Sequence, residues 1–285
     1  MLYSPLRYPG GKNKLAKFIS KICLNNKING HYVEPYAGGA AVALHLLIEK
    51  KVNKITINDY DRSIYAFWHS VLRNPKKLCD LIEKTEINIE NWQRAKNIQR
   101  NKAKAKLLDL GFSTFFLNRT NFSGILNGGV IGGLKQNGQY KMDCRFNKKA
   151  LIKKIQLINK YQAKITLHNL DALELIKKIQ QEPNNQKTIF YCDPPYCLKG
   201  ASLYMNHYDA DQHKKVANVI KKIKNLNWII SYDNTPVIEK IYKWVPPQRK
   251  IKRSFNHSAH KAKRGKEILF FSKNLNTPRE VLDAR

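Results

Sequence analysis

The chain lacks the features that would place it in a membrane or outside the cell. Its 285 residues contain no apolar run near the roughly 18 that a membrane-spanning helix needs. Residues 1–14 lack the apolar centre of a signal peptide. The five cysteines are scattered and odd in number, without a Cys-x-x-Cys pair or a Cys/His cluster. We therefore expect reduced thiols, no bound metal and a cytoplasmic location.

Acidic residues are also scarce, with 21 Asp and Glu against 52 Lys and Arg, which gives a formal net charge of +31. Such an excess favours a polyanionic partner, because basic side chains that neutralise phosphates release condensed counterions. Two stretches, 94–106 and 249–266, contain no acid at all. We expect the first to contact phosphates or to form a solvated helix face, and the second to form a loop on the nucleic-acid side.

Apolar runs separated by helical patterns organise the chain. They predict strands over residues 31–34, 54–58, 164–168, 188–192, 227–232 and 267–272. The segment 40–50 predicts a helix between the first two strands. Strand–helix–strand units of this spacing predict an α/β fold with a parallel sheet.

The middle of the chain departs from this rhythm. It has a helical stretch and then a segment rich in Gly and Asn with hairpin and turn signals. We therefore predict a first part of a catalytic domain over 1–66, an inserted module over 67–150 and a second catalytic part over 151–285.

The run from Thr188 to Tyr196 carries the most informative motif. It is an apolar strand that ends in Asp-Pro-Pro-Tyr, and neither Pro194 nor Pro195 can extend the strand, because proline lacks the N–H that a ladder needs. Open α/β sheets bind ligands at such carboxyl ends of strands. The Asp193 carboxylate and the Pro194 carbonyl can accept the two hydrogens of an exocyclic amino group, while Tyr196 offers a flat face. The motif thus predicts a site for a planar base, although a rigid turn alone would also explain it.

Other predicted strands end in residues suited to a nucleoside. Residues 33–40, Val-Glu-Pro-Tyr-Ala-Gly-Gly-Ala, precede a helix, where glycines let a ligand approach the backbone. Asp59 follows the second strand, where α/β nucleoside binders hold ribose hydroxyls, and Asp171 follows the third, within reach of an adenine amino group. Each feature also suits an ordinary turn or helix cap, but their recurrence at successive strand ends favours a nucleoside site. The absence of Gly-x-Gly-x-x-Gly argues against a pyrophosphate.

In their order along the chain, these motifs resemble those of the Dam-like (alpha class, D12 type) DNA adenine-specific methyltransferases. The matching segments are 7–12 (Arg-Tyr-Pro-Gly-Gly-Lys), 33–39, 58–59 (Asn-Asp), 118–124 (Asn-Arg-Thr-Asn-Phe-Ser-Gly), 193–196 and 264–267 (Arg-Gly-Lys-Glu). The resemblance implies a Rossmann-like S-adenosylmethionine-dependent methyltransferase fold with an inserted target-recognition module. It also implies site-specific methyl transfer to the exocyclic amino group, adenine-N6, of a flipped adenine in double-stranded DNA.

The resemblance further implies roles for individual residues. The catalytic residues would be Asp193, Pro194, Pro195 and Tyr196. The cofactor-binding residues would be Tyr8, Lys12, Glu34, Pro35, Tyr36, Gly38, Gly39, Asp59 and Asp171. From the inserted module and the second basic stretch, the expected DNA-binding residues are Arg119, Asn121, Lys135, Asn137, Lys141, Arg253, Lys261, Lys263 and Arg264. Arg and Asn would read base edges, and Lys would meet phosphates.

The expected context is a monomer acting on double-stranded DNA in a bacterial or phage cytoplasm, associated with the nucleoid and without membrane contact. A restriction–modification system with a companion restriction endonuclease acting on the same site is compatible with this resemblance. The chain departs from relatives that read GATC over residues 128–133 and 140–147, so GATC is not assigned as its target.

Three alternatives to a DNA adenine methyltransferase stay open. An RNA adenine methyltransferase would share the chemistry, but the sequence shows no separate RNA-binding module. Methyltransferases acting on the cytosine amino group tend to have Ser where Asp193 stands. A nucleic-acid binder without catalytic activity would not need the intact Asp193 and the intact loop over 33–39.

Overall fold

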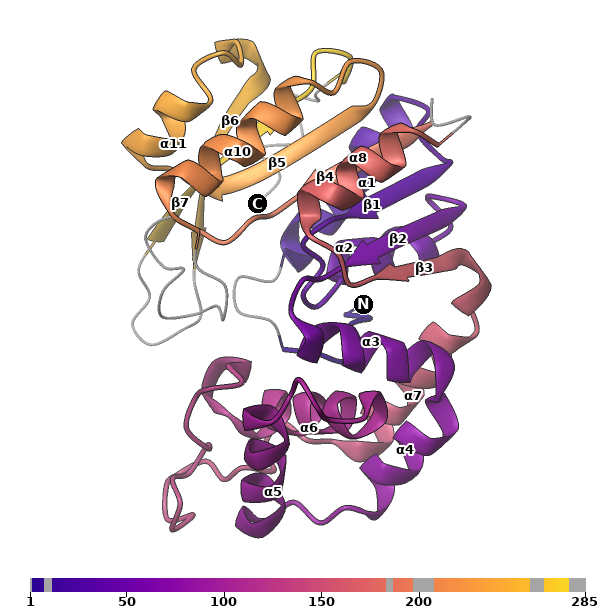
Figure 1. Ribbon diagram of the computed structural model, residues 1–285, viewed down its shortest axis with the longest axis vertical. Coiled ribbons are helices and arrows are strands. Elements are labelled where there is room, and N and C mark those ends of the chain that lie inside the picture. The colour runs from indigo at the N-terminus through magenta and orange to yellow at the C-terminus, as the bar shows by residue number, and fades with distance from the viewer. Residues whose placement is uncertain (1, 8–11, 183–186, 197–207, 257–263, 277–285) are drawn as a thin grey trace.

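The computed structural model describes residues 2–7, 12–182, 187–196, 208–256 and 264–276. Figure 1 shows a part built on a β-sheet above a part made of helices. The sheet has seven strands in the order β3-β2-β1-β4-β5-β7-β6. Their bounds are β1 His31–Glu34, β2 Lys54–Asn58, β3 Ile165–His168, β4 Thr188–Cys192, β5 Asn227–Asp233, β6 Lys250–Asn256 and β7 Arg264–Phe271.

The first five strands run parallel, and β7 lies antiparallel between β5 and β6. The chain starts the sheet at β1, continues to β2 and β3 on one side, and returns to add β4 on the other side of β1. The strand order therefore reverses between β1 and β4. Open α/β sheets bind ligands outside the carboxyl ends of strands at such a point.

Helices cover both faces of the sheet because its central strands are apolar on both sides. Along β4, the side chain of Ile189 belongs to one hydrophobic cluster and that of Phe190 to the other. The first cluster includes residues of α1 (Asn13–Asn25), α2 (Ala41–Ile48) and α3 (Arg62–Arg73). The second includes residues of α8 (Ala172–Gln180), α10 (Ala210–Lys221) and α11 (Pro236–Ile241). Within the described ranges, no helix has both the length and the hydrophobicity to cross a bilayer.

The lower part of Figure 1 is a helical unit that packs on α3. We use this name for α4 (Pro75–Lys84), α5 (Ile89–Arg100), α6 (Leu107–Thr120) and α7 (Lys148–Asn159). Its core is aromatic: the Phe67 and Phe115 rings stack with centroids 5.8 Å apart, and Phe146 meets Phe115 edge-on at 5.4 Å. These rings belong to the first hydrophobic cluster, which also includes side chains from one face of the sheet. The sheet and the helical unit therefore share a core. The module boundaries proposed at residues 67 and 150 fall inside α3 and α7.

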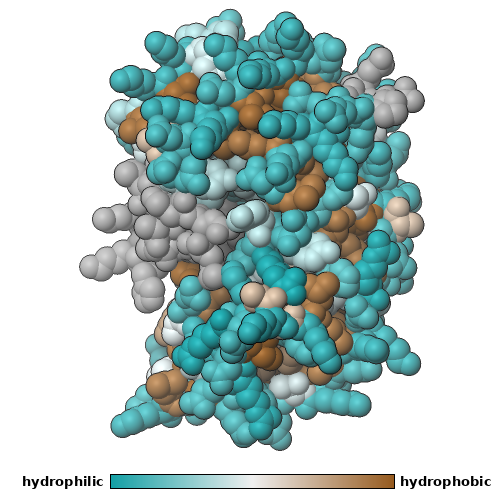
Figure 2. Space-filling model, viewed as in Figure 1, coloured by the Kyte–Doolittle hydropathy of each residue, from teal (hydrophilic) through white to brown (hydrophobic). Residues whose placement is uncertain are grey.

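Figure 2 shows that hydrophilic side chains cover most of this face of both parts.

One expectation about local structure was wrong, and one agrees with the structure. The basic stretch 249–266 does not form one loop, because β6 and the start of β7 pair across it. Charged and apolar residues alternate over Lys250-Ile251-Lys252, as is typical of an edge strand. The lysines make this strand difficult to recognise from the sequence. The glycine-rich segment 121–147 contains turns, as its sequence signals indicate, together with the short 3₁₀ helix η1 (Phe122–Gly124) and one isolated antiparallel bridge.

We predict that Gly111→Ala destabilises the protein, although alanine favours a helix interior by about 1 kcal/mol over glycine. A Cβ at Gly111 would lie 2.4 Å from Ser70 Oγ and 2.5 Å from the backbone oxygen of Ala66 on α3. We expect a loss of about 1–3 kcal/mol in the free energy of unfolding, measured in urea. The control Gln93→Ala, on an exposed face of α5, should leave stability unchanged. A Gly111→Ala variant that unfolds at a higher urea concentration than the wild type would show that α3 and α6 do not pack as closely as these distances indicate.

Candidate active site

Acidic side chains gather where the strand order reverses. Glu34 is the last residue of β1, and Asp193 directly follows β4, the neighbouring parallel strand. Asp59 directly follows β2 on the other side of β1. Parallel strands end at the same edge of a sheet, so residues far apart in the chain meet there.

Asp193 is held by groups from two other elements. Ser231 of β5 donates a hydrogen bond to Asp193 Oδ1 at 2.7 Å, and Ser231 Oγ lies 2.9 Å from the Tyr191 hydroxyl. The Lys12 ammonium, from the residue before α1, lies 3.4 Å from the same Asp193 oxygen. The Asp193 side chain keeps 21% of its surface exposed, so the carboxylate is oriented from inside the protein and still open to a ligand.

Tyr196 and Glu267 complete this buried group. The Tyr196 hydroxyl donates to Glu267 Oε1 at 2.8 Å and also contacts Lys12 Nζ. Lys12 Nζ lies 2.9 Å from the same Glu267 oxygen and 4.6 Å from the centre of the Tyr196 ring. Glu267 comes from β7, which places the segment before α1, the loop after β4 and the antiparallel strand around one ammonium.

The charges in this group influence one another strongly. Burial would lower the pKa of Lys12, but the Asp193 and Glu267 carboxylates outweigh it and raise that pKa. Burial raises the pKa of Asp193, and Glu267 adds to the rise, while Lys12 and Ser231 act against it. One ammonium thus faces two carboxylates. The ionised group carries a net negative charge and favours a ligand that donates hydrogen bonds.

A second carboxylate lies by the glycine loop between β1 and α2. Asp59 accepts hydrogen bonds from the Gly38 N–H and the Asp61 N–H, each at 2.9 Å. Burial, with the nearby Asp61 carboxylate, raises the pKa of Asp59 to about 7. Gly38 has a φ of 47°, in the left-handed region that favours glycine, and its carbonyl accepts a hydrogen bond from Trp68 Nε1. Each Asp59 oxygen has lone pairs left over, so the carboxylate can also accept a pair of vicinal hydroxyls.

Glu34 supports this loop from inside the protein. Its Oε1 accepts hydrogen bonds from the Tyr32 hydroxyl at 2.9 Å and from the Ala43 N–H at 3.1 Å, in the first turn of α2. The carboxyl group is buried, and burial raises the pKa of Glu34 to about 8. An acidic group at a helix N-terminus satisfies backbone N–H groups that have no partner inside the helix.

The loops after β1, β2 and β3 are joined by Asn58. Its amide nitrogen donates to the carbonyls of Pro35 and Leu170, and its Oδ1 accepts from the Leu170 N–H. Asp171 follows as the N-cap of α8 and accepts from the Leu173 N–H at 2.8 Å. This cap occupies one Asp171 oxygen and keeps the residue at the edge where Asp59 lies.

The geometry places most of the expected cofactor residues along one sheet edge. Tyr36 lies half-buried beyond β1, with its ring 6.2 Å from that of Tyr208, and Pro35 and Gly39 are buried beside it. Lys12 instead lies with the Asp-Pro-Pro-Tyr motif. Tyr8 falls outside the described residues.

A comparison with family models matches the chain to the D12 class N6 adenine-specific DNA methyltransferases over residues 8–261. The chain belongs to this family. The expected Rossmann-like methyltransferase fold is thus confirmed, as a mixed α/β structure with a mostly parallel seven-stranded sheet. Membership makes the protein an adenine-specific DNA methyltransferase and implies S-adenosylmethionine as the methyl donor.

No curated protein matches this methyltransferase. Among solved structures, it is similar to two of the rRNA methyltransferase aviRa from Streptomyces viridochromogenes, at 2.4 Å and 1.5 Å resolution. Each has 9% sequence identity and a TM-score of 0.38, and the match covers 94% of this chain and 87% of that chain.

Two residues of this methyltransferase that were expected to read DNA bases serve the protein interior instead. Asn121 is fully buried, and its side chain accepts from Trp92 Nε1 and donates to the carbonyls of Ile125 and Leu126. Arg119 donates to the Pro5 carbonyl, and burial lowers the pKa of its guanidinium to about 10. In this conformation neither side chain is available to a base edge, so we no longer assign that role to them. Polar residues in a turn-rich segment supply hydrogen bonds that regular strands would otherwise make.

The remaining expected DNA contacts differ in their exposure. Lys135, Asn137 and Lys141 are exposed in the segment between α6 and α7. Arg253 on β6 is half-buried, with its guanidinium 5.2 Å from the centre of the Phe18 ring. Lys261, Lys263 and the side chain of Arg264 fall outside the described residues.

The sequence interpretation missed the roles of Ser231, Tyr191 and Glu267 in this methyltransferase. Glu267 had a usable signal: it is the first acid after an 18-residue basic stretch, 249–266, and directly precedes the apolar run Ile-Leu-Phe-Phe. A lone acid at a buried strand position needs a cationic or hydrogen-bonding partner. No comparable signal singled out Ser231, because a single serine within an apolar strand is uncharged and forms no motif with its neighbours.

We predict that Glu34→Gln changes how stability depends on pH. Burial raises the pKa of Glu34 to about 8 in the folded protein, while a solvated glutamate titrates near ~4.3. The folded state therefore keeps a proton that the unfolded chain loses, and wild-type stability falls as the pH rises between these values. Glutamine retains the acceptor oxygen and cannot lose that proton. The free energy of unfolding of Glu34→Gln, relative to that of the wild type, should therefore increase by more than about 1.4 kcal/mol when the pH is raised from about 5 to about 8.5. Urea unfolding at the two pH values measures this change.

The control for this experiment is Glu83→Gln, an exposed position on α4. Its stability difference from the wild type should stay the same at both pH values. A Glu34→Gln difference that is equally independent of pH would contradict a protonated, buried Glu34.

Proposed function

We propose that this enzyme transfers a methyl group from S-adenosylmethionine to N6 of an adenine flipped out of double-stranded DNA, within a specific short sequence. The observation that carries the proposal is the Asp193 carboxylate, which Ser231 and Lys12 orient at the end of β4 while a fifth of its side chain stays exposed. Flipping costs a few kcal/mol, and contacts of the extruded base in the site offset it.

The residues at the sheet edge suit S-adenosylmethionine. The Asp59 carboxylate has free lone pairs for ribose hydroxyls, and Gly38, with its left-handed backbone, lets a ligand approach without a Cβ in the way. Tyr36 offers an aromatic face beside the same loop, and Asp171 lies at the next strand end. When bound, this cofactor supplies an electrophilic methyl group carried on a sulfonium.

The residues of the Asp-Pro-Pro-Tyr motif would orient the adenine amino group. The Asp193 carboxylate and the Pro194 carbonyl each accept one N6 hydrogen, which directs the nitrogen lone pair out of the ring plane. Tyr196, whose hydroxyl is fixed by Glu267, packs its ring against the base. Such fixed groups lower the barrier because no reorganisation is needed during the reaction.

The charge balance around Lys12 also favours methyl transfer. Positive charge would develop on N6 as its bond to the methyl group forms and the methyl–sulfur bond breaks, with S-adenosylhomocysteine as the leaving group. The Asp193 and Glu267 carboxylates, which outnumber the single Lys12 ammonium, would stabilise that charge. The surplus N6 proton then passes to solvent. Burial raises the pKa of the Cys192 thiol far above its usual range, so this neighbour stays protonated and does not act as a nucleophile.

We further propose that the exposed residues Lys135, Asn137 and Lys141 contact the DNA. Lysines would meet phosphates, and Asn137 would reach a base edge. The protein would work as a monomer, since one base is modified at a time. A restriction–modification context with a companion endonuclease rests on the family resemblance alone.

The test of this function is expression in a host without adenine methylation, followed by single-molecule sequencing of the genome. We expect N6-methyladenine at one short motif with the wild type. We expect none with Asp193→Ala, because losing an acceptor of the amino group costs at least about 100-fold in rate. Soluble protein that leaves the genome unmodified would sink the proposal, as would an active Asp193→Ala variant.

We predict that Lys12→Met moves the acidic limb of the pH–rate profile to higher pH. Lys12 lowers the pKa of Asp193, so removing its charge raises that pKa, and the ionised acceptor then forms only at higher pH. The measurement is single-turnover methylation of a duplex across pH. Lys17→Met, an exposed position on α1, should keep the wild-type profile. If the acidic limb of the pH–rate profile of Lys12→Met lies at the same pH as in the wild type, Lys12 does not control the ionisation of Asp193.

A further inference from the structure

An ion pair joins the helical unit to the end of the sheet that carries Asp59. Lys102, in the link between α5 and α6, places its ammonium 3.1 Å from Asp61 Oδ1. The Asp61 side chain is 10% exposed and that of Lys102 is 32% exposed. This lysine belongs to the basic stretch 94–106, where the sequence favoured a phosphate contact or a solvated helix face.

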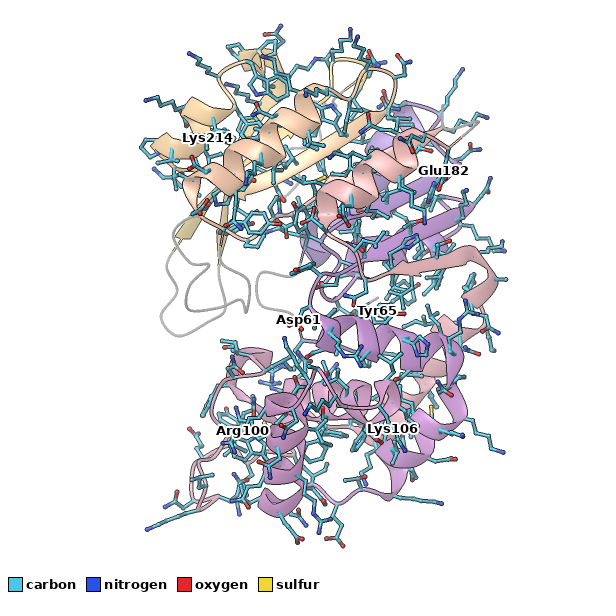
Figure 3. All side chains as sticks on the ribbon, viewed as in Figure 1. Asp61, Tyr65, Arg100, Lys106, Glu182 and Lys214 are labelled. Carbon is cyan, nitrogen blue, oxygen red and sulfur yellow. The ribbon has the colours of Figure 1, made fainter. Side chains whose placement is uncertain are left out.

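The backbone around this ion pair is fixed by further contacts. Arg62 donates from Nε to the Lys102 carbonyl and from Nη2 to the Ala105 carbonyl, both at 3.0 Å. Ser63 Oγ donates to Gln99 Oε1 at 2.8 Å. The first turn of α3 therefore holds the end of α5 and the following link in place. In Figure 3, Asp61 lies at the start of α3, and Arg100 and Lys106, on either side of Lys102 in the chain, lie in the helical part.

Asp61 is in turn connected to Asp59. Its N–H donates to Asp59 Oδ1 at 2.9 Å, and its own Oδ1 caps α3 by accepting from the Ser63 N–H. Two carboxylates thus stand two residues apart at the edge proposed to hold the cofactor ribose. A like charge this close disfavours ionisation of Asp59, and a nearby cation offsets that effect.

We propose that Lys102 is a positioning residue for the cofactor site: its ammonium balances the Asp61 charge and keeps Asp59 in the ionised form that accepts the ribose hydroxyls. This inference rests on the proposed use of S-adenosylmethionine at Asp59. It assigns Lys102 to the cofactor and removes it from the residues available to DNA phosphates. It also makes cofactor affinity depend on a side chain of the helical unit.

The groups around Asp59 set the direction of this effect. Burial and the Asp61 charge raise the pKa of Asp59 to about 7, while hydrogen bonds from the Asp61 and Gly38 N–H groups and, as the smallest of these effects, the Lys102 ammonium act in the opposite direction. Tyr208, before α10, also interacts electrostatically with the Asp59 and Asp171 carboxylates: burial raises the pKa of its hydroxyl, and these two carboxylates raise it further. Because the pKa of Asp59 lies near neutrality, a modest change in it alters the ionised fraction of Asp59 under ordinary conditions.

The test compares Lys102→Met with the wild type by calorimetric titration with S-adenosylhomocysteine, from about pH 6 to pH 9. Removing the ammonium raises the pKa of Asp59, so the variant should bind about two- to fivefold more weakly near neutral pH. The two affinities should converge toward the upper end of the range, where Asp59 is ionised in both proteins. Lys104→Met, an exposed position in the same link, should bind like the wild type at every pH.

A second measurement separates this role from a DNA contact. Affinity for a duplex without cofactor should have the same salt dependence in Lys102→Met and in the wild type, whereas a lost phosphate contact would make the salt slope shallower. Unchanged cofactor affinity, a loss that is equal at all pH values, or a shallower salt slope would each overturn the inference. If the wild type itself binds no S-adenosylhomocysteine, the proposed use of the cofactor fails, and the inference about Lys102 fails with it.

Discussion

The arrangement of the site depends on one buried ammonium. Lys12 precedes the first helix, yet its Nζ contacts Asp193 after β4, Glu267 on β7 and the Tyr196 hydroxyl. A buried lysine is stable only when carboxylates balance its charge, and two carboxylates this close need a cation between them. The segment before α1, the Asp-Pro-Pro-Tyr motif and the antiparallel strand are therefore stabilised together.

A second set of polar contacts joins this sheet to the helical unit. Asn118 of α6 accepts from the Arg7 N–H and donates to the Arg7 and Gly124 carbonyls, so it holds the N-terminal segment against the turn after α6. At the other end of the unit, Arg62 and Lys102 connect α3 to the link after α5. The residues proposed for chemistry and those proposed for DNA contact thus belong to one continuous structure with a shared hydrophobic core.

Much of the sheet was predictable from the sequence, because apolar runs bounded by turns report buried parallel strands. The predicted strands 31–34, 54–58 and 188–192 coincide with β1, β2 and β4. The edge strand β6 was missed, since its exposed lysines conceal the alternation of apolar residues. Asn121 was misassigned because an amide in a turn-rich segment looks the same in the sequence whether it faces DNA or three partners in the protein interior.

The sequence by itself determined which residues end the parallel strands and, through the motifs there, the family of the protein. Strand ends can be located because apolar periodicity and proline are local properties of the chain. Only the tertiary structure decided that Glu267 faces Lys12 across 255 positions and that Lys102 pairs with Asp61 across 41. Ion pairs between distant segments depend on how helices and strands pack, and no local pattern encodes that packing.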